Sequence, residues 1–122
     1  MSRVEDLNKA LSDLQASTAD IEASAVVSED GLIIASSLPQ NVQEPRVAAM
    51  SAAMLSMGTR TAVELGRGGL EQIFVKGDAG YVIISHAGKH AALLALARKE
   101  AKLGLIFYEL GRAGDAIKNI LS

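Results

Sequence analysis

The residues in this sequence that could do chemistry are gathered between Ser85 and His90. Ser85 is followed directly by His86, and this pair with His90 nearby could supply a nucleophile and a base for hydrolysis. The apolar run before them predicts a strand, however, and neighbouring strand residues point to opposite faces. Ser85 and His86 therefore cannot readily meet, and the pattern indicates no orienting carboxylate nearby. Polar residues at the end of a strand are the favoured interpretation.

Phosphate binding and metal binding can be considered for the same stretch. Gly88-Lys89 is one part of a phosphate-binding loop, but that loop requires a glycine where Ile83 stands and Ser or Thr where His90 stands. His86 and His90 could share a metal ion on a helix, yet here they flank a predicted turn with no acidic or thiol third ligand. We therefore expect no metal, no cofactor and no catalytic residue, so an enzyme is the least favoured class.

The charged residues are weighed in the same way. Glu5-Asp6 is typical of the first turn of a helix, where carboxylates favour the positive end of the dipole, and Glu29-Asp30 is typical of a turn. Arg46, Arg60 and Arg67 flank an uncharged segment and could supply positive charge to a phosphoryl transition state. A solvated or contact role is far more common, and we name none of the three as catalytic.

Composition limits the remaining classes. A chain of 122 residues predicts one domain over residues 1–122, and 49% hydrophobic with 21% charged residues indicates a folded protein. The net charge of −2 and an aromatic content of 3% argue against nucleic-acid binding. The absence of cysteine excludes disulfides and thiol chemistry. No run approaches the ~18 apolar residues of a membrane span, and the first residues lack the apolar core of a signal peptide. We expect a cytoplasmic protein with no membrane partner.

Hydrophobic periodicity and turn residues predict eight elements. They are a helix over residues 3–16, strands over 21–27 and 32–36, a helix over 47–65, strands over 70–76, 81–85 and 91–97, and a helix from 103 onward. Residues 37–45 are expected to form a loop. The strand connections are short, so the order α-β-β-α-β-β-β-α predicts an antiparallel sheet with helices layered on it, in the α+β class. The strands over 81–85 and 91–97 are apolar on both faces and should be central.

The helix over Val47–Leu65 is the element around which the chain is organised. The thirteen residues between Arg46 and Arg60 carry no charge. A helix without a charged face is normally covered on more than one side, and one sheet covers only one of them. We expect a second copy of the chain to cover the rest. The alternative is a central helix enclosed within a single monomer.

Four segments in the expected order resemble the Roadblock family of dynein light chains and MglB-type GTPase regulators. They are the hairpin AVVSEDGLIIASS at residues 25–37, the Ala- and Met-rich helix after it, GYVII at residues 80–84, and AKLGLI at residues 101–106. Each segment alone is weakly specific, but together they cover nearly the whole chain.

The resemblance implies a profilin-like fold with a five-stranded antiparallel sheet of order 2-1-5-4-3, one helix on one face and two on the other. It further implies a homodimer joined through the Val47–Leu65 helices and the Leu70–Lys76 edge strands. The residues expected at this interface are Met50, Met54, Met57, Arg60, Leu70, Gln72 and Phe74.

The function that the resemblance implies is non-enzymatic and prokaryotic in character. MglB-like members bind a Ras-like small GTPase and stimulate its GTP hydrolysis without donating an arginine finger. One alternative is a structural adaptor or scaffold subunit with the same fold and no effect on hydrolysis. A small-ligand sensor is a weaker alternative, because the sequence shows no convergent polar groups.

Overall fold

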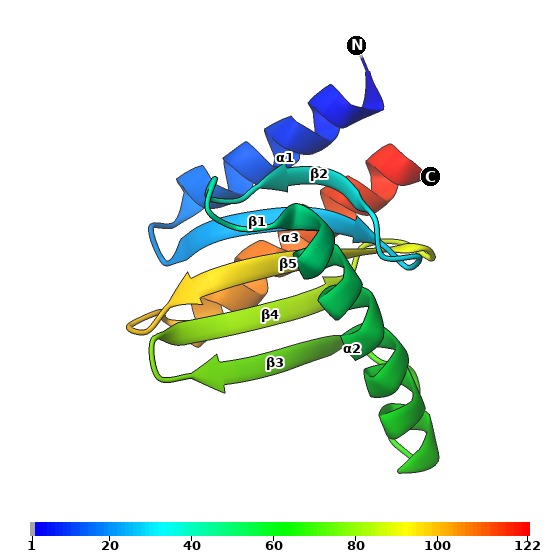
Figure 1. Cartoon of the computed structure of the whole chain (residues 1–122). Helices are drawn as coiled ribbons and strands as arrows, with labels where there is room; N and C mark the ends of the chain where they lie inside the picture. Colours follow the sequence, from blue (N-terminus) through cyan, green and yellow to red (C-terminus); the bar gives the residue numbers. More distant parts are fainter. Residues whose placement is uncertain (1) are drawn as a thin grey trace.

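A computed structural model describes residues 2–122, which form three helices and five strands (Figure 1). The elements are α1 (Arg3–Ser17), β1 (Ile21–Ser28), β2 (Ile33–Ser37), α2 (Glu44–Glu64), β3 (Gln72–Gly77), β4 (Gly80–His86), β5 (Ala91–Arg98) and α3 (Leu103–Leu121). Their types and order are those predicted from the sequence.

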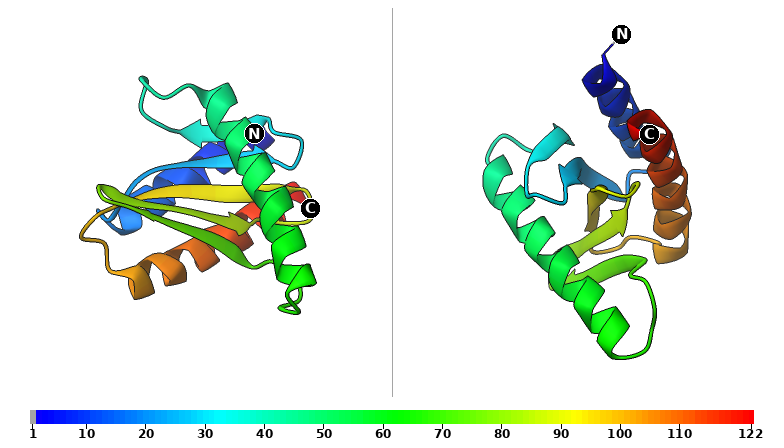
Figure 2. Two further views of the ribbon diagram at one scale, coloured as in Figure 1. Left: turned by 60° about the horizontal axis from the view of Figure 1, so that its bottom comes forward. Right: turned by 90° about the vertical axis from the view of Figure 1, so that its right-hand side faces the viewer.

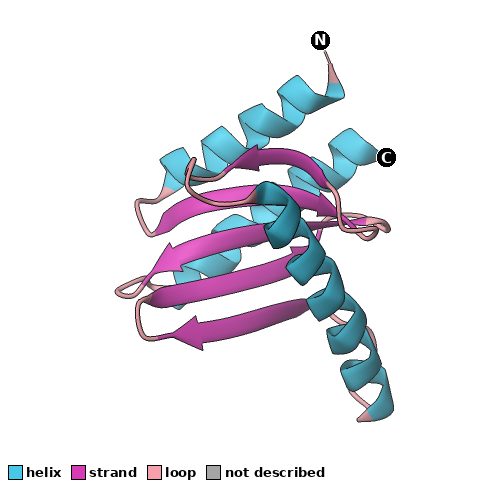
Figure 3. Ribbon diagram, viewed as in Figure 1, coloured by secondary structure: helices cyan, strands magenta, loops and turns pink. Residues whose placement is uncertain are grey.

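The five strands form one antiparallel sheet in the order β2-β1-β5-β4-β3 (Figure 3). The predicted strand order is therefore confirmed. Helices α1 and α3 lie together on one face of the sheet, and α2 crosses the other face obliquely, so that the sheet lies between two helical layers (Figure 2). β5 is the central strand and β4 its neighbour, as their apolar character predicted.

Local signals explain most helix boundaries, and one expectation about them is wrong. The Ser2 hydroxyl accepts a hydrogen bond from the Glu5 amide at 3.1 Å and so caps the start of α1. Helix α2 begins at Glu44, three residues before the predicted start, and so includes Pro45, which was assigned to the preceding loop. Proline is favoured in the first turn of a helix, because a backbone N–H at that position would have no partner within the helix.

The predicted strand over residues 70–76 also begins too early. β3 starts at Gln72, so Leu70 and Glu71 belong to the connection from α2. β3 pairs only with β4 and forms one edge of the sheet, as expected. Gly66 and Gly68 follow the end of α2 with φ of +72° and +83°, a backbone conformation that glycine adopts readily.

Two apolar clusters hold the layers together. On the side of α1 and α3, the fully buried side chains include Leu7, Leu11, Ile106 and Ile117, which pack against Leu93. On the side of α2, the buried cluster is smaller and consists of Ala25, Val27, Ala48, Leu55, Ile84, Ala92 and Leu94. The buried apolar cluster under α2 is thus smaller than the one under α1 and α3.

A buried carboxylate that the sequence analysis did not single out joins three elements. The Arg98 Nε donates to Asp20 Oδ1 at 2.6 Å, and the Lys102 amide donates to Asp20 Oδ2 at 3.0 Å. Lys102 immediately precedes α3, so Asp20 places negative charge at the start of that helix. The backbone hydrogen bond from Lys102 and the Arg98 guanidinium together lower the pKa of Asp20 below its ordinary value.

Candidate interaction surface

The structure does not bring Ser85 and His86 together as a hydrogen-bonded nucleophile and base. Ser85 and His86 are adjacent in β4, and no hydrogen bond joins them. His90 Nδ1 lies 2.8 Å from Glu29 Oε1, so the expectation of no nearby carboxylate is wrong for this histidine. β1 and β5 are neighbours, and their pairing brings the β1–β2 turn beside the β4–β5 turn. The pair is largely exposed, and no group of three metal-ligating side chains occurs among residues 2–122.

The three weighed arginines lie at the surface of α2 and just beyond it. Arg60 forms an exposed pair with Glu64 at 3.4 Å. Arg67 Nε donates to the Leu65 carbonyl at 3.1 Å, which places it against the end of the helix. Arg46 is exposed in the first turn of α2. The three are spread along the helix and do not converge on one point.

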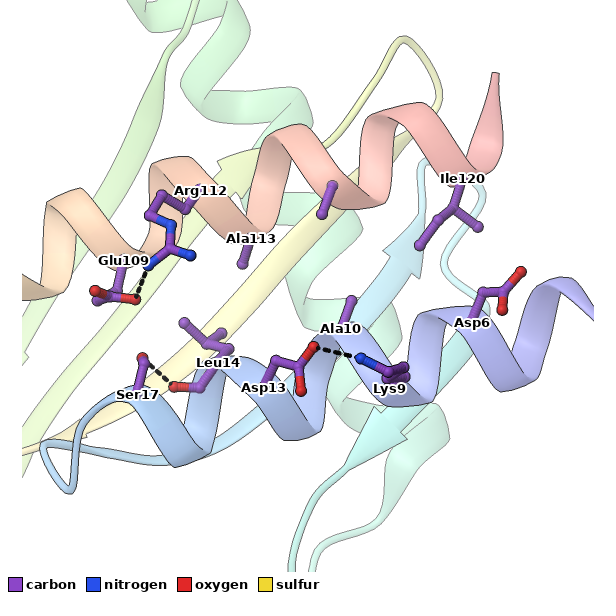
Figure 4. A pocket seen from close by; sticks show the side chains of 11 residues that line it. Asp6, Lys9, Ala10, Asp13, Leu14, Ser17, Glu109, Arg112, Ala113 and Ile120 are labelled. Atoms are coloured by element: carbon purple, nitrogen blue, oxygen red, sulfur yellow. Dashed lines mark hydrogen bonds and ion pairs between the residues drawn. The ribbon is translucent and has the colours of Figure 1, made fainter.

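A depression lies between α1 and α3 and has a volume of about 420 Å³ (Figure 4). Its floor is lined by small and aliphatic side chains, including Ala10 and Ala113. Its cations are already paired, since Lys9 contacts Asp13 at 3.1 Å and Arg112 contacts Glu109 at 3.6 Å (Figure 4). Each of these pairs is formed within one helix, and the lining also includes the carboxylate of Asp6.

The apolar surface of α2 is left largely open. Only Ala48, Ser51 and Leu55 of this helix are buried, whereas Met50 and Met57 have exposed fractions of 53% and 61%. The C-terminal turns of α2 extend past the β3 edge of the sheet, where Val63 and Leu65 are also exposed (Figures 1 and 2). A single chain therefore covers one side of this helix and leaves its other apolar side in solvent.

An apolar groove continues this surface onto the sheet. The groove has a volume of about 230 Å³ and lies between the N-terminal half of α2 and the strands β3, β4 and β5. Its walls are apolar except for Ser51, whose hydroxyl donates to the Val47 carbonyl. The lining residues are Leu38, Val42, Val47, Met50, Ser51, Met54, Val75, Val82, Ile84, Leu94 and Leu96.

The interface residues predicted from the sequence fall on two faces of the molecule. Met50 and Met54 line the groove, and Met57 is exposed further along α2. Leu70 packs beneath Gly58, where an added Cβ would lie 3.3 Å from a Leu70 methyl carbon. Phe74 lies instead on the α3 side, with its ring centroid 6.1 Å from that of Phe107.

The sequence analysis omitted Val75, which points to the α2 side and has an exposed fraction of 41%. Period-2 alternation along β3 would have separated Phe74 from its neighbours Ile73 and Val75, but three consecutive apolar residues conceal that alternation. We define the α2 surface as the exposed apolar side of α2, the adjoining groove and Val75.

Comparison with known proteins agrees with this architecture. Residues 7–97 match the model of the Roadblock/LC7 domain family. Two uncharacterized proteins of Methanocaldococcus jannaschii, MJ0310 and MJ0714, are 42% and 41% identical over 101 residues, which cover 83% of this chain and 88% and 85% of theirs. The chain therefore belongs to the Roadblock/LC7 family.

Solved structures show the same fold at lower sequence identity. Myxococcus xanthus MglB superimposes with a TM-score of 0.90 at 19% identity, over 99% of this chain and 91% of that one. A structure described as MglB with tetrameric arrangement gives 0.89 at 19% identity, over 98% and 90%. Acanthamoeba castellanii profilin IA gives 0.66 at 14% identity, over 92% and 96%. The fold is thus the profilin-like Roadblock fold.

None of the helices within residues 2–122 is both long enough and apolar enough to cross a membrane.

Proposed function

We propose that this chain acts in the cytoplasm as a homodimeric, non-enzymatic regulator that binds a Ras-like small GTPase. Membership of the Roadblock/LC7 family and the MglB-like fold support a regulatory binding role. The observation that carries the proposal is the α2 surface, because a helix with open apolar sides needs a protein partner to cover them.

The homodimer is the first part of the proposal. The α2 surface lies beside β3, whose outer edge carries unpaired backbone N–H and C=O groups. Two copies related by a two-fold axis could cover both features at once, since each would offer the same apolar helix and the same strand edge. The expected interface residues remain Met50, Met54, Met57, Arg60, Leu70, Gln72 and Phe74, with Val75 added.

Solution mass by light scattering tests the homodimer. Met57→Glu is the sharper variant, because Met57 is exposed, whereas Met54 is partly buried against the core and its substitution could unfold the chain. We expect a dimer for the native chain and a folded monomer for Met57→Glu. Val4→Glu is the matched control, since Val4 is an exposed apolar residue of α1, and this variant should remain a dimer. A native monomer would contradict the proposal.

Regulation of a GTPase is the second part. Single-turnover GTP hydrolysis by a Ras-like GTPase of the same organism should accelerate when the dimer is added. We propose that no arginine of this chain enters the active site, so Arg46→Ala, Arg60→Ala and Arg67→Ala should each retain the acceleration within about twofold. Loss of an arginine finger would instead cost ~10³-fold or more. A dimer that binds the GTPase equally in both nucleotide states and leaves hydrolysis unchanged would be a scaffold subunit.

A further inference from the structure

A buried carboxylate on α3 lacks hydrogen-bond donors within the described part of the chain. Glu109 has an exposed fraction of only 8%, yet none of the hydrogen bonds among residues 2–122 is donated to its side chain. Its ion-pair partner is Arg112, whose Nη1 atom lies 3.6 Å from Glu109 Oε2, which is longer than a hydrogen bond. Buried carboxylates normally accept hydrogen bonds, so the donors for Glu109 remain to be found.

The carboxylate of Glu109 can be reached from the depression between α1 and α3. Every fully enclosed side-chain oxygen or nitrogen of residues 2–122 has a hydrogen-bond partner, so the Glu109 oxygens are not fully enclosed. Glu109 lines the depression at the same end as Ser17 (Figure 4). The Ser17 hydroxyl has one proton and donates it to the Leu14 carbonyl at 2.6 Å, so it cannot serve Glu109. A donor that enters the depression from solvent could.

A second carboxylate lies at the opposite end of the depression. Asp6 and Ile120 are together at that end, because α1 and α3 run in opposite directions along the two sides (Figure 4). The helical rise places Asp6 and Ser17 about 16 Å apart along α1. Asp6 forms no ion pair within residues 2–122. Its carboxylate and that of Glu109 therefore mark the two ends of an elongated depression.

The lining between these ends is aliphatic, with one more carboxylate. The floor is formed by Ala10, Leu14, Ala113 and Ala116. Asp13 stands on α1 between the two ends (Figure 4). The cations of the lining, Lys9 and Arg112, have side chains that are 76% and 64% exposed, and ion pairs this exposed contribute little stability. Both cations can turn into solvent, which leaves three carboxylates for an incoming ligand.

We propose that this depression binds a linear aliphatic polyamine, with one ammonium group at Glu109, another at Asp6 and the methylene chain on the floor between them. Each ammonium group brings positive charge and N–H donors, which a buried carboxylate without hydrogen bonds requires. A metal ion fits less well, because no group of three metal-ligating side chains occurs among residues 2–122. A lysine side chain of a partner protein carries a single ammonium group and could not occupy both ends.

Isothermal titration with simple amines at low ionic strength tests this proposal. Octamethylenediamine and putrescine both carry two ammonium groups, but octamethylenediamine is the longer, and butylamine carries only one. We expect one octamethylenediamine to bind per chain, at least about tenfold more tightly than putrescine or butylamine, because neither of these reaches both carboxylates. Mg²⁺ carries the same charge as the diamines and should not displace octamethylenediamine at equal concentration.

Two carboxylates of α3 supply a matched pair of variants. Glu109→Gln keeps the shape of the side chain, removes its charge and should weaken octamethylenediamine binding at least about tenfold. Asp115→Asn removes the same charge from an exposed residue outside the depression and should leave binding within about twofold. Asp6→Asn should weaken octamethylenediamine but not butylamine, which needs only the Glu109 end. Ala116→Leu should fill the floor and weaken all the amines, and because Ala116 is exposed, this loss could not be attributed to a disturbed core.

The polyamine site lies within one chain, on the face of the sheet opposite α2 (Figure 2). Met57→Glu should therefore bind octamethylenediamine as the native chain does, whatever its mass in solution. Absence of binding to the native chain would overturn the polyamine site and leave the homodimer and the GTPase proposal standing. Equal losses for Glu109→Gln and Asp115→Asn would show attraction to the net charge alone and would also overturn it. Equal affinities for octamethylenediamine and putrescine would do the same.

Discussion

Gly80 lies where the backbone of β5 leaves no room for a side chain on β4. It begins β4 with φ of +153°, and a Cβ added there would lie 2.5 Å from the Ala97 carbonyl oxygen of β5. No flexible side chain could yield to relieve that contact, because the opposing atom belongs to the backbone of the central strand. Glycine is therefore the only residue that this position accepts without displacement of β4 from β5.

We predict that Gly80→Ala destabilises the fold by about 2–3 kcal/mol, because the strands must separate locally. Gly77→Ala is the matched control across the same hairpin. Its Cβ would meet the Gly80 carbonyl at 3.7 Å, an ordinary contact, so its cost should stay below ~1 kcal/mol. Urea denaturation of both variants provides the measurement, and similar costs for the two would contradict this account.

Asp20 contributes a pH-dependent part of the stability. Its folded-state pKa is lowered from 3.8 by the Lys102 amide and the Arg98 guanidinium. For a lowered carboxyl pKa, the stabilisation is complete above the unfolded value and is lost as the pH falls through the folded value. Arg98 in turn has its pKa raised by Asp20, which leaves it charged across this whole range.

Asp20→Asn should accordingly lower Tm at neutral pH, since a neutral amide forms no ion pair with Arg98 and places no negative charge at the start of α3. The difference in Tm between native and variant chains should be constant above about pH 5 and shrink below about pH 4. Thermal scans from pH 2.5 to 7 would measure it. Asp13→Asn, in an exposed pair with Lys9, is the control and should change Tm little at any pH. A constant difference down to the lowest pH would refute the assignment.

Helix α2 and strand β3 illustrate how element-level packing depends on one small residue. Gly58 faces Ile73 and Leu70, and an added Cβ would lie 3.1 Å from the Ile73 Cδ1 atom. This close approach seats the middle of α2 above the edge strand. Glycine in a helix interior normally weakens the helix, so its presence here is explained by the space that it leaves for these two side chains.

We predict that Gly58→Val destabilises the fold by about 1–2 kcal/mol, since the branched side chain would push α2 away from β3. Gly111→Ala should stabilise the fold by up to ~1 kcal/mol, because it enters open space on α3. Adding a side chain at a helical glycine is thus expected to have opposite effects on stability in α2 and α3. Chemical denaturation with a common slope for both variants would check the prediction, and a stabilising Gly58→Val would show that α2 is free to shift.

Most elements could be predicted from the sequence because their signals are local. The Leu7, Leu11 and Leu14 spacing defined α1, and the two-sided apolar runs placed β4 and β5 in the middle of the sheet. The face to which Phe74 points was not predictable, because its two neighbours are also apolar. The Asp20–Arg98 pair also escaped prediction, since its partners lie 78 positions apart and no periodic pattern links them.

At the scale of the whole molecule, assembly should affect stability. If two chains fold as a dimer, then unfolding also dissociates them, and Tm must rise with chain concentration. We expect a measurable upward shift in Tm from about 1 to 200 μM for the native chain and none for Met57→Glu. Differential scanning calorimetry at several concentrations would detect it. A Tm independent of concentration would indicate a chain that folds alone.

The overall order of the sheet was available from the sequence only through the family resemblance. Periodicity and turn residues gave an antiparallel sheet, but many strand orders satisfy short connections. The α2 surface could be predicted in part, because an uncharged helix is expected to be covered on more than one side. The groove beside it was not, because its lining comes from three strands and a loop that meet only in the folded chain.

The second edge strand of the sheet, β2, bears on how many chains could join through their strands. β2 is the edge opposite β3; it has five residues, and its pairing with β1 slips in register between Val26 and Val27. In a dimer joined through β3, both outer margins of the combined sheet would be β2 strands. A short, irregular margin is a poor template for another strand. Growth by strand addition would therefore terminate at two chains, and a sheet with such apolar strands would be protected from extending into a fibre.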